Sequence, residues 1–180
     1  MENDKVILVN EHDDMIGTMD KMEAHKQGLL HRAFSIFIFN SKGEMLLQQR
    51  AFSKYHSGGL WSNACCSHPM PGEKTIDAAQ RRLKEELGLE TPVEKIFDFI
   101  YKTELENGLT ENEFDHVYAG EYEGKLDADP KEVNDFCYKE IAEIKNMLQT
   151  RPQKFTAWFH LAFPKIGEWW ASRYQNISAL

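Results

Sequence analysis

The sequence is short of cysteine and of positive charge, and each shortage excludes a class of protein. Only three of the 180 residues are cysteine, and two of them, Cys65 and Cys66, are adjacent, a spacing that strains a disulfide. We therefore expect free thiols. Lysine and arginine number 21 against 29 acidic residues, which gives a formal net charge of -8. A surface of that average sign repels polyanions, so we expect neither nucleic acid nor a membrane as a partner.

Long apolar runs and flexible linkers are missing as well. In the first ten residues the apolar run covers only Val6 to Val9, so we expect no signal peptide, no membrane-spanning helix and a cytoplasmic location. No stretch rich in proline, glycine or serine divides the chain, and 180 residues suffice to bury a sizeable core. We therefore expect one domain over residues 1–180, present as a monomer or a weak homodimer.

Alternating apolar residues predict β-hairpins. In the stretch AFSIFIF, Phe34, Ile36 and Ile38 fall on one face, and the turn that follows leads into a second strand at residues 45–50. The other predicted strands are residues 95–102 and 113–122, joined by a loop with the Asn107-Gly108 turn signal, with weaker candidates for strands or turns at 5–9 and 18–22.

The apolar period then changes to that of a helix. Four apolar residues share one helical stripe and a glycine follows as a stop signal: Ile76, Ala79, Leu83, Leu87 and Gly88. Further helices are predicted at residues 139–149 and in the aromatic segment 154–170, where Pro164 interrupts the spacing. Strands and helices in this order, with one helix among the strands, indicate an α+β or mixed α/β fold.

The stretch NACCSHPMPGE, residues 63–73, gathers thiols, an imidazole and a carboxylate just before the first predicted helix. From Glu73 to the segment RRLKEELGL the sequence resembles the Nudix box, a loop-helix-loop that holds a divalent metal against a diphosphate with glutamates. Two positions depart from that pattern: Ser67 replaces its first glycine, and Arg82 replaces a glutamate of its hydrolytic helix. An arginine is suited to gripping phosphate oxygens rather than metal.

Separate blocks spread over nearly the whole chain are similar to one branch of that superfamily, the type I isopentenyl diphosphate isomerases. The blocks are EAHKQGLLHRAFS, QQRAFSK, WSNACCSHP, RRLKEELG and TENE. The resemblance implies a Nudix-like fold, with a central mixed sheet flanked by helices. It also implies a 1,3-allylic shift that interconverts isopentenyl diphosphate and dimethylallyl diphosphate through a tertiary carbocation.

The same resemblance implies which residues carry the chemistry. Cys66 and Glu113 fall at the positions of the two proton-transferring groups, and Tyr101 at that of a tyrosine that assists the glutamate. Which group is the acid in each direction stays open. Trp158 falls at the position of an active-site tryptophan whose ring face would stabilise the carbocation, although its spacing from Phe155 is equally that of a core aromatic.

The implied metal and substrate ligands complete the expected site. The metal ligands are His25, His31, His68, Glu111 and Glu113, a mixed nitrogen and oxygen set that suits Mn²⁺, Mg²⁺ or Zn²⁺. Glu86 falls where a Mg²⁺ carried in with the diphosphate is bound. Lys21, Arg50, Lys54 and Arg82 fall where the substrate diphosphate is gripped. On a strand, Glu111 and Glu113 would point to the same side.

Three other interpretations remain open. A Nudix hydrolase would use Glu73, Glu85 and Glu86 for metal, and a degenerate Nudix module would only bind a phosphorylated ligand. A redox protein would use the thiols of Cys65 and Cys66. For Arg82 and Glu86 alone, the purely structural interpretation is a helical i,i+4 salt bridge.

Overall fold

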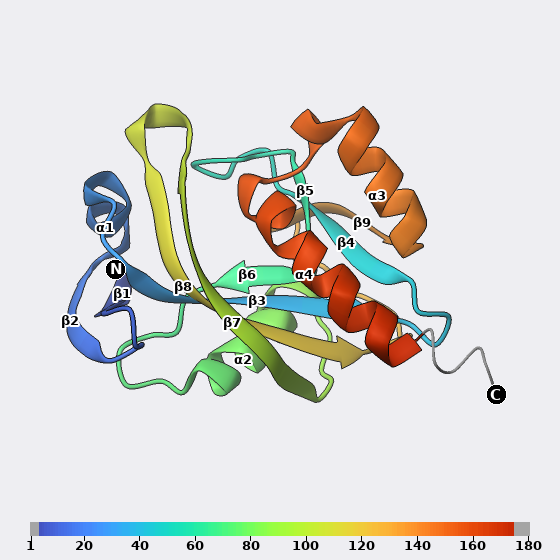
Figure 1. The fold of residues 1–180 in the computed structure, drawn as a ribbon, viewed down its shortest axis with the longest axis horizontal. Helices are drawn as coiled ribbons and strands as arrows, with labels where there is room; N and C mark the ends of the chain where they lie inside the picture. Colours follow the sequence, from blue (N-terminus) through green and yellow to red (C-terminus); the bar gives the residue numbers. More distant parts are fainter. Residues whose placement is uncertain (1–3, 175–180) are drawn as a thin grey trace.

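The computed structural model describes residues 4–174, which fold as an α+β unit around one nine-stranded mixed sheet (Figure 1). The strands are β1 Lys5–Val9, β2 Met15–Asp20, β3 His31–Phe39, β4 Met45–Arg50, β5 Trp61–Ser62, β6 Cys65–Ser67, β7 Val93–Glu104, β8 Thr110–Glu121 and β9 Val133–Lys139. The helices are α1 Lys21–Gln27, α2 Thr75–Leu87, α3 Ile141–Thr150 and α4 Ala157–Tyr174, with short 3₁₀ turns at Glu106–Gly108 and Pro152–Lys154. Within residues 4–174, no helix is long and apolar enough to cross a membrane.

Strand β3 is the centre of the sheet. It pairs in parallel with β8 from His31 beside Glu113 to Phe39 beside Glu121, and antiparallel with the short β6, where Ser35 lies beside Cys66. The long β7–β8 hairpin continues the sheet beyond β8. Backbone pairing alone therefore brings His31 to Glu113 and Ser35 to Cys66.

Two hydrophobic cores lie on the two faces of the sheet. Phe34, Ile36 and Ile38 of β3 pack toward α2, as their predicted common face requires, whereas Phe37 and Phe39 pack toward α3 and α4. In Figure 1, α4 runs across one face of the sheet while α2 lies on the other. Because β3 is covered on both faces, its sequence is apolar at successive positions rather than at alternate ones.

Helix α2 follows its prediction closely. It begins at Thr75 and ends at Leu87, and the predicted stripe is buried at Ala79, Leu83 and Leu87. The stop signal is also confirmed, because Gly88 adopts the left-handed conformation (φ 64°) and its N–H closes the last turn on the Lys84 carbonyl.

Several predicted boundaries are wrong. Pro164 lies inside α4 and does not end it, because the buried aromatic face of that helix, which includes Phe159 and Phe163, stabilises the helix by more than the roughly 3 kcal/mol that a proline costs. The predicted segment 18–22 spans the end of β2 and the start of α1, and residue 139 belongs to β9 rather than to a helix. Strands β5, β6 and β9 were not predicted.

We expect Gly88→Ala to lower the free energy of unfolding by about 2 kcal/mol, because the added Cβ would meet the Asp127 carbonyl oxygen at 2.7 Å in a backbone conformation that alanine disfavours. Gly72→Ala is the matched control: its φ is also positive, but no atom of the residues that the structure describes lies within 4 Å of the added Cβ. Urea denaturation should show a smaller loss of about 1 kcal/mol in the control. Equal losses would mean that the contact with Asp127 does not matter.

Candidate active site

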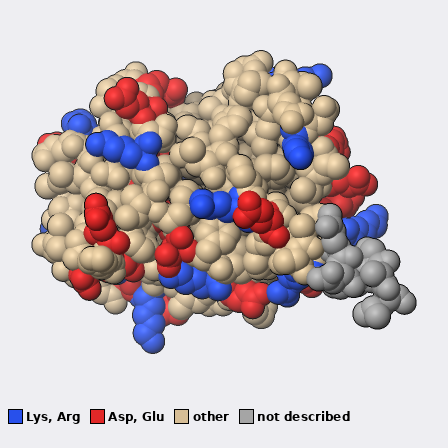
Figure 2. Space-filling model, viewed as in Figure 1, with Lys and Arg blue, Asp and Glu red and all other residues tan. Residues whose placement is uncertain are grey.

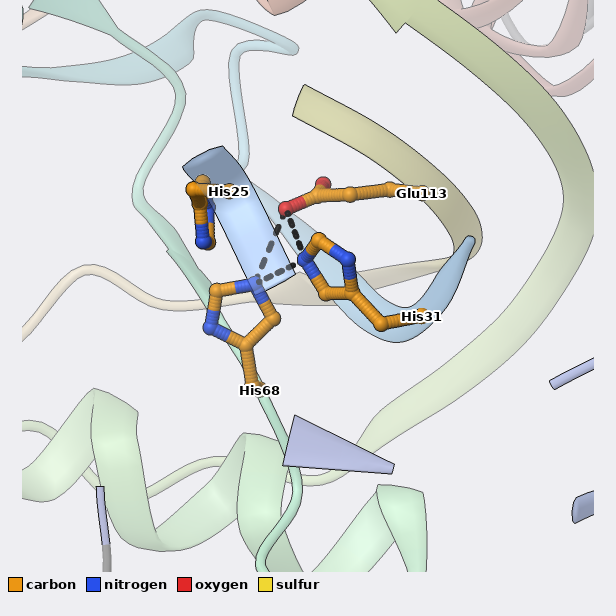
Figure 3. Close-up of side chains that lie close together, drawn as sticks. All are labelled: His25, His31, His68 and Glu113. Atoms are coloured by element: carbon orange, nitrogen blue, oxygen red, sulfur yellow. Dashed lines mark hydrogen bonds and ion pairs between the residues drawn. The ribbon is translucent and has the colours of Figure 1, made fainter. Parts of the chain in front are cut away.

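Three imidazoles and one carboxylate meet at one end of the sheet (Figure 3). They come from four elements: His25 from α1, His31 from the start of β3, His68 from the segment after β6, and Glu113 from β8. One ligand atom from each lies within 4.8 Å of all the others. Glu113 Oε1 is 2.9 Å from His68 Nε2 and 3.6 Å from His31 Nε2, and the two imidazole nitrogens are 3.2 Å apart.

The hydrogen bonds of two imidazoles fix which nitrogen faces this cluster. His25 Nδ1 lies 2.7 Å from the Lys21 carbonyl oxygen, and His31 Nδ1 lies 2.8 Å from that of Leu29. Because a carbonyl only accepts, both Nδ1 atoms carry the proton and both Nε2 atoms offer a lone pair. Among residues 4–174, the buried Nε2 atom of His25 has no hydrogen-bond partner, a costly state that a bound cation would relieve. The cluster therefore fits a divalent metal ion.

Electrostatics around the cluster keep its ligands in metal-binding form. Burial opposes the charge of Glu113, but the close approach of the His31 and His68 rings, at 3.6 and 2.9 Å from Oε1, outweighs it and holds the pKa of Glu113 well below its usual range. Burial lowers the pKa of His68 to about 4, so its imidazole is neutral near pH 7, as metal binding requires.

Glu111 lies beside the cluster rather than in it. Its carboxylate is not among the four converging ligand atoms, but it reaches the same side of β8 as Glu113, because both meet the hydroxyl of Tyr101. Tyr101 Oη is 2.5 Å from Glu113 Oε2 and 3.1 Å from Glu111 Oε2. Burial and the nearby charge of Glu113 raise the pKa of Glu111 well above its usual range. A tyrosine hydroxyl thus links the two carboxylates.

The two adjacent cysteines face opposite sides of the sheet. Cys65 is part of the core against α2, whereas the Cys66 thiol donates to Asn63 Oδ1 at 3.1 Å and lies 3.3 Å from Ser35 Oγ. Cys65, Cys66 and Cys137 are free thiols, as expected. Burial, reinforced by Asp115, raises the pKa of Cys66, so its sulfur is protonated near pH 7.

An inner cavity of about 90 Å³ collects the predicted catalytic and substrate-binding residues. Its wall includes Cys66, Tyr101, Glu113 and Trp158, the four cations Lys21, Arg50, Lys54 and Arg82, and also Glu86, Glu111 and His68. Trp158 is held by a hydrogen bond from Nε1 to Ser62 Oγ (2.9 Å). It is therefore both a buried aromatic and a wall of the cavity.

A larger outer cavity of about 610 Å³ adjoins the inner one. The two share Lys21, Lys54, Ser67, His68 and Arg82, so three of the predicted substrate cations lie where the cavities meet. The surface seen in Figure 2 has acidic and basic groups interspersed. Within an acidic protein, a local concentration of cations at this junction can still attract an anion.

The predicted salt bridge on α2 also forms. Arg82 Nη2 donates to Glu86 Oε1 and Nη1 to Glu85 Oε2, both at 2.7 Å. Glu86 is buried and also accepts from Gln48 Nε2. In the wall of the inner cavity, the Arg50 guanidinium lies 5.1 Å from the centroid of the Trp158 ring.

Sequence reasoning missed His56, a buried imidazole that lines the inner cavity. Its Nε2 lies 3.8 Å from Glu111 Oε1, and its ring is perpendicular to that of Trp158. Burial, with the Arg50 charge, lowers its pKa to about 3. The next residue, Ser57, has a left-handed backbone (φ 52°) and donates its N–H to Glu106 at the tip of the β7–β8 hairpin. A lone histidine in a polar loop gives no signal that it will be buried.

Sequence reasoning also missed four polar residues near the site: Asn63, Ser35, Asp115 and Glu132. The side-chain amide of Asn63 donates to the carbonyls of Ile36 and Cys65, so its oxygen is fixed toward Cys66. Ser35 donates to the buried Asp115 at 2.7 Å. Asn63 and Ser35 had a signal in the sequence, because they belong to the blocks WSNACCSHP and EAHKQGLLHRAFS, whereas Asp115 and Glu132 lie outside every block.

A family model and individual known proteins both match this chain. The model of the NUDIX domain matches residues 29–159. The chain is 50% identical over 166 residues to the isopentenyl-diphosphate Delta-isomerase of Pectobacterium atrosepticum, covering 92% of this chain and 93% of that protein. It is 45% identical over 177 residues to the isopentenyl-diphosphate Delta-isomerase of Serratia proteamaculans, covering 98% and 99%.

Solved structures show the same fold at low sequence identity. DR0079 from Deinococcus radiodurans matches with a TM-score of 0.68 and 17% identity, covering 82% of this chain and 90% of that one. A MutT protein from Methanosarcina mazei Go1 matches with a TM-score of 0.63 and 18% identity, covering 77% and 94%. At these identities the likeness concerns the fold alone.

We expect His25→Asn to weaken binding of Mn²⁺ or Zn²⁺ at least about tenfold, because it removes the lone pair of a buried nitrogen that has no other partner in the described part of the chain. Calorimetric titration of protein stripped with a chelator measures this. His12→Asn is the control, since His12 is exposed and outside the cluster. Unchanged affinity in the His25 variant would show that the ion binds elsewhere.

Proposed function

The chain belongs to the NUDIX domain family and, within it, to the isopentenyl-diphosphate Delta-isomerases, and we infer that it interconverts isopentenyl diphosphate and dimethylallyl diphosphate with Cys66 and Glu113 as its proton-transferring groups. The observation that carries this assignment is one cavity whose wall joins a thiol, a carboxylate, an aromatic ring and four cations. The reaction is a step of isoprenoid biosynthesis.

The reaction needs an acid and a base on either side of a five-carbon chain. An unactivated alkene is a poor base, and its protonation gives a tertiary carbocation that must then lose a proton from another carbon. Cys66 and Glu113 suit these roles because they come from β6 and β8, which pair with opposite edges of β3, and both side chains reach the same cavity. Tyr101 supports Glu113 through the 2.5 Å hydrogen bond.

The proposed metal ligands are His25, His31, His68 and Glu113, together with Glu111, which shares the Tyr101 hydroxyl with Glu113. A divalent ion bound there, Mn²⁺, Zn²⁺ or Mg²⁺, would supply positive charge that fixes the ionisation and orientation of Glu113. We assign Glu86 to a Mg²⁺ that accompanies the diphosphate, since Mg²⁺ favours one or two carboxylates together with phosphate oxygens.

Substrate orientation follows from the position of the cations. Lys21, Lys54 and Arg82 lie where the two cavities meet, so a diphosphate held there would direct its hydrocarbon chain into the inner cavity. Trp158 would then face the carbocation, an interaction worth about 2 kcal/mol in a dry pocket. Ser62 accepts from Trp158 Nε1 and donates to Asn63 Oδ1, so the ring and the partner of Cys66 are positioned together.

The alternative of a Nudix hydrolase is disfavoured by Arg82, which replaces a carboxylate of the hydrolytic helix with a cation, and by the contacts of Glu73 and Glu85. Glu73 is occupied by a bidentate pair with Arg81, at 2.7 and 2.9 Å, and Glu85 pairs with both Arg81 and Arg82. A redox pair is also disfavoured, because Cys65 and Cys66 face opposite sides of β6. We further propose one domain over residues 1–180, a cytoplasmic location, and a monomer or weak homodimer without nucleic-acid or membrane partners.

Proton NMR in D₂O tests the activity directly. With isopentenyl diphosphate and Mg²⁺, we expect the methyl signals of dimethylallyl diphosphate to grow and deuterium to enter the product, because the acid exchanges its proton with solvent. Unchanged isopentenyl diphosphate in the presence of Mg²⁺ with Mn²⁺ or Zn²⁺ would refute isomerisation. Phosphate release from nucleoside diphosphate derivatives would then be the next measurement.

We expect Cys66→Ala to lower kcat by at least about 10³-fold while substrate binding changes little, because the variant loses a proton-transferring group and keeps the cations. Cys137→Ala is the matched control, since that thiol lies on β9 and outside the cavity. Steady-state rates and calorimetric affinity for the diphosphate measure the two effects. An unchanged rate in Cys66→Ala would remove this residue from the mechanism.

A further inference from the structure

A carboxylate that the proposed mechanism does not use lies among the substrate cations. Glu132 precedes β9 and lines the outer cavity. One of its oxygens forms a close ion pair with Lys54 Nζ, and the other lies 3.4 Å from Arg82 Nη2. A single carboxylate therefore bridges two of the cations that we assign to the diphosphate.

This arrangement is held by the backbone as well as by charge. The Glu132 carbonyl accepts from the Ala51 N–H at 2.9 Å, and the Ala51 carbonyl accepts from the Lys54 N–H at 3.2 Å. Lys54 and Glu132 are thus presented to each other by neighbouring, hydrogen-bonded segments. Burial works against the charge of Glu132, but Lys54 and Arg82 outweigh it and lower the pKa of Glu132, so the group is anionic near pH 7.

We propose that Glu132 is a resident anion that occupies a phosphate position in the free enzyme and is displaced when the diphosphate binds. This inference rests on the proposed function, because it takes Lys54 and Arg82 as diphosphate ligands. The carboxylate holds both cations in place before substrate arrives, and it lowers the affinity for diphosphate because every ligand must break its ion pairs. It therefore acts as a positioning residue that also favours release of the product.

The ion pair between Lys21 and Asp4 is more exposed to solvent than the pair between Lys54 and Glu132. That pair is 2.6 Å long, but the Asp4 side chain is 62% exposed, against 22% for Glu132. Solvent screens an exposed pair strongly, so its loss has little effect on binding. Glu132, which faces two cations in a partly buried site, is the stronger competitor for them.

The proposal predicts that removal of the Glu132 charge strengthens the binding of a diphosphate. Calorimetry with magnesium pyrophosphate and the metal-loaded enzyme should show that Glu132→Gln binds about fivefold or more tightly than the wild type. Glu132→Asp, which retains the charge but reaches less far, should lie between them. In the isomerase assay, Glu132→Gln should lower the KM for isopentenyl diphosphate without raising kcat. This is the result expected when a change strengthens binding of the ground state and of the transition state by the same amount.

Glu143→Gln is the matched control, because Glu143 also pairs with a lysine at 2.6 Å but lies outside both cavities, and it should bind magnesium pyrophosphate like the wild type. Unchanged or weaker binding by both Glu132 variants would overturn the proposal and leave Glu132 as a structural support. Wild-type enzyme that fails to bind magnesium pyrophosphate would overturn it as well. The binding measurement needs no turnover, so a failure of isomerase activity in D₂O would be recognised separately.

Discussion

The parallel register between β3 and β8 is the constraint on which the site depends. It places His31 beside Glu113 and continues without a shift to the far end of both strands. Because side chains alternate along a strand, a slip of one residue would turn Glu113 away from the imidazoles. The register is held by two cores at once, since Phe34 packs toward α2 and Phe37 toward α4, and a slip of β3 would expose both.

The same alternation separates the two adjacent thiols. Cys65 fills the core beneath α2, and Cys66 reaches the cavity, where Asn63 and Ser35 hold its sulfur. The two cysteines thus lie in different environments, because β6 pairs with β3 in one register. The block NACCSHP is short, yet it supplies a core residue, a positioned thiol and, in His68, a metal-cluster imidazole.

Charge in this site is arranged in opposed pairs. The protein is acidic, and the cations where the cavities meet have carboxylate partners: Lys21 with Asp4, Lys54 with Glu132, and Arg82 with Glu85 and Glu86. Such pairing keeps the cations ordered and limits how tightly an anion is held. Burial lowers the pKa of His25, His56 and His68, and within residues 4–174 the Nε2 atom of His25 has no hydrogen-bond partner. Polar groups of both kinds are thus in place for a metal and for a diphosphate.

The sequence by itself determined three features: the apolar stripe of α2 with its Gly88 stop, the β3–β4 hairpin, and the family. The first two depend on local periodicity and turn residues, and the family is recognised from short motifs. The sequence also identified most residues of the inner cavity, although not Tyr55 or His56, through the resemblance to a known family. Only the tertiary structure decided that α4 continues through Pro164, that His56 is buried beside Glu111, and that Glu132 bridges Lys54 and Arg82. The physical reason is that these features depend on contacts between distant segments: packing outweighs a local helix breaker, and burial and ion pairing depend on what lies across the space. No pattern of neighbouring residues records such contacts.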